Sequence, residues 1–180
     1  MIALVYFVHG TTVDNENGVA TGWRHGELSA KGLSESCALS RVVSGSTFSA
    51  IYSSDLRRAL KSATLVFGDR YDIFPDGRLR ECDYGQMTGS PVRLIQSVMV
   101  DSISRPFPGG ESYKSVEDRV ARFLEDLIRK WRTGRIGMVG HQGPQLALEV
   151  LLQGKSWEQA IDEDWRRSGD WQPGWEYSLA

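Results

Sequence analysis

The sequence predicts an α/β sandwich with a mostly parallel central sheet. Two continuous apolar runs, at residues 2–8 and 135–140, are typical of central strands that are buried on both faces. Helical patterns lie between these runs, so strands and helices alternate along the chain. At 180 residues the chain fits a single domain, residues 1–180, and is long enough to bury a sizeable apolar core.

The first half of the chain supplies the expected elements in alternating order. The strand at 2–8 is followed by a helical pattern at 28–43, a strand candidate at 49–54 and a second helical pattern at 55–67. A longer helix follows, because apolar residues recur at three- and four-residue spacings on one face. These residues are Val116, Val120, Phe123, Leu124, Leu127, Ile128 and Trp131.

The C-terminal part carries a helix start and many aromatic residues. Ser156 and Gln159 form a capping-box pattern, and "WEYSL" at 175–179 fits either an edge strand or an aromatic segment that closes over a substrate ring. Aromatic residues at a rim more often complete the core. The tryptophans concerned are Trp23, Trp157, Trp165, Trp171 and Trp175. Arg105, Lys114 and Arg166 could bind further anionic groups, although a solvated surface is the usual place for such side chains.

Composition excludes several classes of partner. The 21 lysines and arginines are balanced by 23 acidic residues, so no net basic field exists that would hold nucleic acid or an anionic membrane. Cys37 and Cys82 show no metal-binding spacing and are expected to be reduced thiols. The apolar N-terminal run is too short to cross a bilayer and has no basic region before it. We therefore expect a cytoplasmic protein.

Two histidines follow the two apolar runs in a similar way. His9 in "FVHGTT" and His141 in "MVGHQG" each come directly after an expected strand, with a glycine one or two residues later. In parallel sheets ligands bind beyond the carboxyl ends of the strands, and a helix start favours an anion. The two side chains could therefore face one phosphate-sized site, although each alone could equally be a hydrogen-bonded structural histidine.

Two other segments carry chemically useful groups. Arg57 and Arg58 stand at an expected helix start, where a guanidinium could bind phosphate oxygens through two parallel hydrogen bonds. Glu81 and Asp83 precede a glycine-containing turn, where an acid could protonate a leaving group. A solvated basic turn and a surface loop are the ordinary alternatives.

Six segments together resemble the histidine phosphatase superfamily, also called the phosphoglycerate mutase-like family. They are "FVHGTTVDN", "GWRHGELSAKG", "YSSDLRRALKSA", "LRECDYGQMTG", "PGGESYKSVEDRV" and "MVGHQGPQLALEVL", in the family's order. The resemblance covers most of residues 2–153 and implies a three-layer α/β/α sandwich that needs no metal and no cofactor.

The resemblance also implies roles for individual residues. His9 would be the nucleophile that forms a phosphohistidine, and Glu81 would be the proton donor and then the base. Asn15, Arg58 and His141 would form the phosphate pocket. This agrees with general chemistry, since a neutral imidazole is a competent nucleophile and fixed cationic donors stabilise the charge on the transferred group. Asp83 is the nearest substitute for Glu81.

Val8 is the main departure from the family pattern, which normally has arginine before the first histidine. Losing one charge-assisted contact costs about 1.5–3 kcal/mol, or roughly 10- to 150-fold in binding or rate. Arg24 is our leading candidate to replace this arginine, with exposed loop arginine as the alternative. The adjacent His25 and the hydroxyls of Thr11 and Thr12 offer further donors.

The expected function is hydrolysis of a small phosphorylated metabolite. Mutases of the family carry an insertion after the glutamate and an Arg-His-Tyr run, whereas here only a short stretch separates "LRECDYG" from "PGGES". A degenerate member that binds a phosphorylated ligand or protein without turnover is the alternative from a different class. A zinc site built from His9, His25 and His141 is disfavoured, because no metal-ligand spacing is present.

Overall fold

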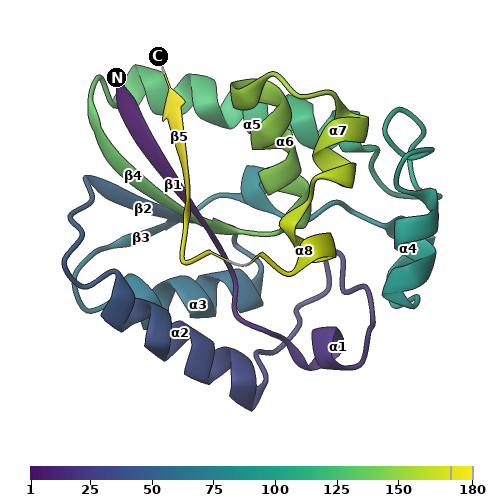
Figure 1. Cartoon of the computed structure of the whole chain (residues 1–180), viewed down its shortest axis with the longest axis horizontal. Helices are drawn as coiled ribbons and strands as arrows, with labels where there is room; N and C mark the ends of the chain where they lie inside the picture. The colour runs from purple at the N-terminus through teal and green to yellow at the C-terminus, as the bar shows by residue number, and fades with distance from the viewer. Residues whose placement is uncertain (171, 180) are drawn as a thin grey trace.

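The computed structural model describes residues 1–170 and 172–179. Its five strands form one sheet in the order β3-β2-β4-β1-β5 (Figure 1). Strands β1 to β4 pair in parallel, and β5 runs antiparallel to β1 at one edge. The strands are β1 (Ile2–Val8), β2 (Ala50–Ser53), β3 (Ile73–Pro75), β4 (Gly134–Gly140) and β5 (Trp175–Leu179). The predicted mostly parallel sheet is confirmed.

Helices cover both faces of this sheet and complete three layers (Figure 1). On one face lie α2 (Ala30–Val42) and α3 (Arg57–Phe67), which contact each other, and on the other lie α5 (Tyr113–Lys130) and α6 (Gln142–Gln153). The shorter helical elements are α1 (Val13–Glu16), η1 (Gly77–Leu79), η2 (Gly85–Met87), α4 (Val92–Val98), α7 (Trp157–Asp162) and α8 (Trp165–Ser168). The predicted three-layer α/β/α sandwich is confirmed.

The core consists of two apolar clusters that the sheet separates. Leu4 and Tyr6 of β1 pack into the cluster that contains residues of α5 and α6, whereas Val5 and Phe7 pack into the one that contains residues of α2 and α3. Successive strand side chains point to opposite faces, and both faces are covered. This explains why the run at 2–8 is apolar throughout rather than alternating.

Most of the predicted elements lie where the sequence places them. The segment "WEYSL" is the edge strand β5, and Ser156 and Gln159 form the capping box of α7. The prediction for the long helix is wrong at its end. Ile128 is 41% exposed. Trp131 is the C-cap of α5, one residue beyond its last helical residue, and it packs against the core.

The segment after His9 also differs from the expectation. Helix α6 begins directly after His141, but α1 begins only at Val13 and has a single turn. Strand β3 and helix α4 were not predicted. Strand β3 has only three residues and ends in Pro75, and α4 follows Pro91 with one buried residue, Ile95, so neither carries a long periodic signal.

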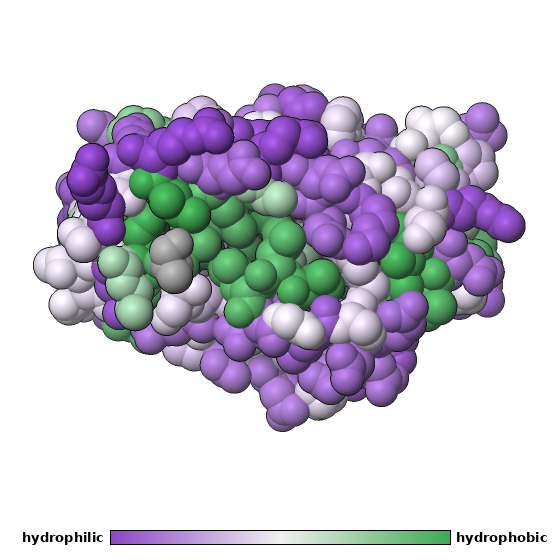
Figure 2. All heavy atoms as spheres, turned by 90° about the horizontal axis from the view of Figure 1, so that it is seen from above, coloured by the Kyte–Doolittle hydropathy of each residue, from purple (hydrophilic) through white to green (hydrophobic). Residues whose placement is uncertain are grey.

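The ends of the strands give the molecule two different faces. Figure 2 shows the face on which β1 begins and β5 ends, where a large apolar area lies between polar residues and a smaller one lies apart from it. His9 follows the opposite end of β1, so this apolar area lies away from the predicted site. No helix among residues 1–170 and 172–179 has the length and apolarity that crossing a membrane requires.

Candidate active site

Two neighbouring strands end beside each other and carry the two histidines. Val8 of β1 is paired with Gly140 of β4, so His9 and His141 follow the same edge of the sheet. The backbone N–H of His9 donates to the carbonyl of Gly140 at 3.2 Å. The ring centroids of the two histidines lie 4.9 Å apart. The sequence could identify both histidines, but only the parallel pairing brings them together.

A hydrogen bond fixes the tautomer of His9. Its Nδ1 lies 2.8 Å from the carbonyl oxygen of Gly10. A carbonyl only accepts, so Nδ1 carries the proton and Nε2 keeps its lone pair. Burial, and next the charge of Arg58, lowers the pKa of His9 from 6.5 to about 3. His9 is therefore a neutral imidazole at neutral pH, with Nε2 available as a nucleophile.

Close packing against α2 and α3 holds the loop after His9. A Cβ atom on Gly32 would lie 2.0 Å from the carbonyl oxygen of Thr11, and one on Gly10 would lie 2.5 Å from the carbonyl oxygen of Gly32. Only glycine fits at these two positions. The N–H of Gly10 also donates to Ser62 Oγ of α3 at 3.0 Å. This packing fixes the carbonyl that orients His9.

His141 is held in the opposite tautomer. Its Nε2 lies 2.9 Å from Ser54 Oγ, which also accepts the N–H of Leu56. The hydroxyl proton of Ser54 has no other acceptor among the described residues, so we assign it to Nε2, which leaves the imidazole proton on Nδ1. Nδ1 is buried and has no partner among the residues described. Burial, followed by the charge of Arg58, lowers the pKa of His141 well below 6.5.

Arg58 is a buried cation at the first turn of α3. Its side chain donates to the carbonyls of Gly22 and Arg24, each at 2.8 Å, and the residue is 3% exposed. Burial lowers the pKa of Arg58 below its usual value, and the charge of Glu81 acts in the opposite direction. No carboxylate of the described chain forms an ion pair with it. Arg57, in contrast, is an exposed partner of Glu27. The buried charge of Arg58 is thus available to an anion.

The carboxylate of Glu81 occupies the start of α6. Oε1 accepts the N–H groups of Cys82 at 2.9 Å and Gly143 at 2.7 Å, and Oε2 accepts that of Gln142 at 3.2 Å. The first amides of α6 therefore bind a carboxylate of the protein itself, not the phosphate that the sequence pattern suggested. These three donors fix the position of the carboxyl group beside the histidines.

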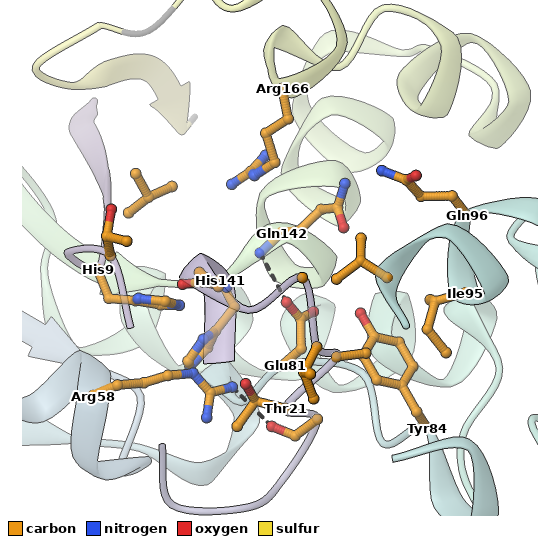
Figure 3. Close-up of a pocket in the computed structure, with 18 of the residues that line it drawn as sticks. His9, Thr21, Arg58, Glu81, Tyr84, Ile95, Gln96, His141, Gln142 and Arg166 are labelled. Carbon is orange, nitrogen blue, oxygen red and sulfur yellow. Dashed lines mark hydrogen bonds between the residues drawn. The ribbon is translucent and has the colours of Figure 1, made fainter. Parts of the chain in front are cut away.

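These groups surround one cavity of about 430 Å³. In Figure 3, His9, Arg58 and His141 point toward the same space, with Glu81 beside Gln142 and Arg166 across from Arg58. The cavity lining includes five of the predicted residues, namely His9, Asn15, Arg58, Glu81 and His141. It combines a candidate nucleophile, a buried cation, a hydrogen-bond donor and a carboxyl group.

Comparison with known proteins shows the family of this chain. The model of the histidine phosphatase superfamily (branch 1) matches residues 5–168. The chain belongs to this superfamily. The predicted family and the expected enzyme class, a phosphatase of the histidine phosphatase superfamily, are thereby confirmed.

Relatives within the superfamily have two kinds of name. Phosphoserine phosphatase 1 of Hydrogenobacter thermophilus is 26% identical over 86% of this chain and 77% of that protein. A 2,3-bisphosphoglycerate-dependent phosphoglycerate mutase of Methylobacterium sp. is 30% identical over 86% of this chain and 82% of that protein. The solved structure of a mycobacterial glucosyl-3-phosphoglycerate phosphatase is 25% identical, covers 89% of this chain and 86% of that one, and superposes with a TM-score of 0.80.

The structure places two predicted residues of this histidine phosphatase outside the cavity lining. The hydroxyl of Thr12 caps α1 by accepting the N–H of Asn15 at 3.0 Å, and Thr11 lines the cavity instead. The guanidinium of Arg24 is 53% exposed and lies 3.6 Å from Asp14. Only the backbone carbonyl of Arg24 takes part, as an acceptor for Arg58. Its placement does not support Arg24 as the replacement for the missing arginine.

The structure also shows where the alternative proton donor and the alternative metal ligands lie. Asp83 accepts the N–H of Gly85 at 2.9 Å and does not line the cavity, so it is not positioned to replace Glu81. His25 is exposed, and no group of three metal-binding side chains occurs in the described part of the chain. Trp171 lies outside the described residues.

Sequence reasoning missed several residues that shape the site. Ser54 orients His141, and Arg119 donates to the Glu81 carbonyl at 2.9 Å while paired with Glu111. Ser54 belongs to the segment "YSSDLRRALKSA", but nothing in the spacing indicates that its hydroxyl faces a histidine 87 residues later. Arg166 of α8 lines the cavity; the sequence offered it as one of three cations that could bind an anionic group, with a solvated surface as the usual alternative.

Proposed function

We propose that this histidine phosphatase hydrolyses a phosphomonoester of a small metabolite in the cytoplasm, through a phosphohistidine on His9. The observation that carries the proposal is the hydrogen bond from His9 Nδ1 to Gly10, because it leaves the Nε2 lone pair beside the buried cation Arg58. A nucleophile next to a cation without a carboxylate partner is suited to phosphoryl transfer.

In the first step, Nε2 of His9 attacks phosphorus while the bond from phosphorus to the alcohol oxygen breaks. Arg58 and the Nδ1–H of His141 supply fixed donors for the oxygens of the transferred group, where charge accumulates. A protonated Glu81 donates its proton to the leaving alkoxide, so the alcohol departs neutral.

In the second step, water attacks the phosphohistidine. The Glu81 carboxylate takes a proton from the water, a phosphorus–oxygen bond forms and the phosphorus–nitrogen bond breaks. Inorganic phosphate leaves, His9 returns to its neutral form and Glu81 is protonated again. The amides of Cys82, Gln142 and Gly143 keep this carboxyl group in place through both steps.

Hydrolysis is favoured over a mutase reaction by the segment after Glu81. The relatives bear both phosphatase and mutase names, so identity alone does not separate these activities. Here residues 82–108 carry one short α-helix, α4, and one 3-10 turn, η2, and no Arg-His-Tyr run follows Glu81. A shorter covering segment gives water easier access to the phosphoenzyme, which supports transfer to water.

The far end of the cavity indicates the chemistry of the leaving group. Its lining from α4 and the preceding loops holds no charged side chain; it includes the apolar residues Val19, Ala20, Val92, Ile95 and Met99 and the neutral polar residues Thr21, Tyr84 and Gln96. The cavity lining holds no lysine, and its arginines are Arg58 and Arg166. We therefore propose an uncharged, partly apolar leaving group.

A ligand-binding protein without turnover is the second candidate. Val8 favours it, since this side chain lines the cavity and provides no charge beside His9. The nucleophile, buried arginine and carboxyl group are all present in the cavity, which supports catalysis.

Incubation with a generic aryl phosphate tests the proposal. We expect product release and an acid-labile phosphohistidine in the unaltered chain, and neither in His9→Ala. Turnover that survives in His9→Ala would refute the mechanism. Binding of phosphate with no turnover on a broad panel of phosphorylated metabolites would favour the second candidate instead.

A further inference from the structure

Arg166 faces the catalytic groups from a different element than Arg58. It lies on α8, near the C-terminal end of the chain, and lines the same cavity as His9 and His141 (Figure 3). We propose that Arg166 is the second guanidinium of the phosphate site and contacts the phosphoryl oxygens of the bound substrate. This inference rests on the proposed phosphomonoesterase function.

The guanidinium of Arg166 is held in place by its neighbours. One terminal nitrogen donates to Asp164 Oδ1 at 2.9 Å and the other to Gln145 Oε1 at 3.0 Å. The group lies over the ring of Trp165, 4.5 Å from its centroid. Each terminal nitrogen has a second N–H, and neither these nor Nε–H donates to a described residue. A positioned guanidinium with free donors is suited to a tetrahedral anion.

The same network reaches the proposed proton donor. Asp164 accepts the side-chain amide of Gln142 with Oδ2, and the backbone N–H of Gln142 donates to Glu81. Asp164 is buried, with a side chain that is 3% exposed. Arg166 is thus attached to the start of α6 through the buried Asp164 and the partly buried Gln142, unlike an exposed loop arginine.

The charge distribution of the cavity also supports the assignment. At the end of β1, residue 8 is valine, so no cation precedes the nucleophile. The residues that line the cavity include two arginines, Arg58 and Arg166, and no lysine. Burial and then the charge of Arg58 lower the pKa of both His9 and His141 most, and the charge of Arg166 acts in the same direction. A phosphate dianion between the histidines would meet one guanidinium from α3 and another from α8.

The neighbouring Arg167 provides a matched control on the same helix. Its side chain is 52% exposed, lies 3.7 Å from Asp162 and is absent from the cavity lining. We expect Arg166→Ala to lower kcat/KM for an aryl phosphate, and the affinity for inorganic phosphate, roughly 10- to 150-fold, the effect of one hydrogen bond to a charged group. Arg167→Ala should change both less than about twofold.

Two further variants separate binding from folding. Arg166→Gln keeps a neutral donor near Asp164 but leaves this buried carboxylate without its ion-pair partner, so its thermal midpoint should fall. Phosphate affinity is therefore measured well below that midpoint, where the folded variant should still bind phosphate more weakly. In the Arg166→Ala background, Val8→Arg should recover at least about 10-fold in kcat/KM, while Val8→Arg alone should gain less. Equal losses in the Arg166→Ala and Arg167→Ala variants, or unchanged phosphate affinity in Arg166→Gln, would overturn the assignment.

The outcomes also distinguish this inference from the proposed function. Normal turnover in Arg166→Gln, together with loss of turnover in His9→Ala, would overturn the role of Arg166 and leave the phosphatase reaction intact. Absence of turnover in the unaltered chain, together with weaker phosphate binding in Arg166→Gln, would overturn the reaction and support the role of Arg166 in binding.

Discussion

His9 and His141 occupy equivalent places at two paired strand ends, yet their surroundings give them opposite properties. His9 donates Nδ1–H to the carbonyl of its own loop and keeps a lone pair on Nε2. His141 is oriented by Ser54 at Nε2, which leaves a proton on the unpartnered Nδ1. The carbonyl beside His9 thus leaves it an electron pair to donate, and the hydroxyl beside His141 leaves it an N–H to donate.

The largest difference between the histidines should appear when each is replaced. His9→Gln removes the attacking nitrogen, so kcat/KM for an aryl phosphate should fall on the order of 10⁴-fold or more. After brief incubation with substrate labelled in its phosphate, a gel run without acid should show no labelled protein. A labelled protein of normal yield would mean that another residue is the nucleophile.

His141→Gln should have a smaller and different effect. It removes a donor to the phosphoryl group and leaves the nucleophile in place, so kcat/KM should fall about 10²- to 10³-fold. Labelled phosphohistidine should still form, but slowly, in single-turnover measurements. Complete absence of label would show that the two histidines are not separated into nucleophile and donor.

Gly143→Ala tests the start of α6, which follows His141. Its Cβ atom would lie 2.7 Å from Glu81 Oε1, so the carboxyl group must shift. We expect a loss on the order of 10²-fold with an alkyl phosphate. The loss should be smaller with p-nitrophenyl phosphate, whose leaving group needs no proton. Gly45→Ala is the control, because nothing lies within 4 Å of its Cβ position. Equal losses with both substrates would argue against proton donation by Glu81.

Ser54→Ala removes the group that sets the tautomer of His141. A single net hydrogen bond contributes about 0.5–1.5 kcal/mol, so we expect up to roughly 10-fold lower kcat/KM. Ser53→Ala is the control at the neighbouring buried position, where the hydroxyl bonds to the carbonyl of Ser54. If both variants lose activity equally, the effect belongs to local packing and not to the tautomer.

The smallest effect concerns the pH dependence of stability. The pKa of both histidines is lower in the folded chain than the ordinary 6.5, and for His9 it is about 3. The unfolded chain therefore binds more protons at acid pH, and stability present above pH 6.5 is lost as the pH falls toward the folded values. Each histidine contributes at most about 1.4 kcal/mol per pH unit.

Urea unfolding at about pH 7 and about pH 5 measures this slope. His141→Gln should flatten it more than His9→Gln, because His141 is 1% exposed whereas His9 is only partly buried. If neither variant changes this slope, other titratable groups control the loss of stability at acid pH.

Much of the fold follows from local patterns. Strand β1 is buried on both faces, so its residues are apolar throughout. Helix α5 is buried on one face, so its apolar residues recur at helical spacing. The short elements β3 and α4 carry too few buried residues for such a pattern. Ile128 shows the opposite error, since it continues the apolar spacing but is exposed beside the buried Leu127.

The sequence by itself determined the fold class, the superfamily and the residue types of the site, including His9, Arg58, Glu81 and His141. These depend on spacing within short segments. The tertiary structure alone decided that Arg166 and not Arg24 faces the cavity, and that Glu81 takes the first amides of α6. Such contacts join residues far apart in the chain, and their geometry follows from how strands and helices pack, which no local pattern encodes.

The opposite tautomers of His9 and His141 have the same origin. A histidine followed by glycine is visible in the sequence at both strand ends, but the partner of each ring nitrogen comes from the surroundings. For His9 this partner is the adjacent carbonyl of Gly10, fixed by contact with Gly32, and for His141 it is Ser54 of the neighbouring strand end. One hydrogen bond within a loop and one between neighbouring strand ends thus turn two similar motifs into two different functional groups.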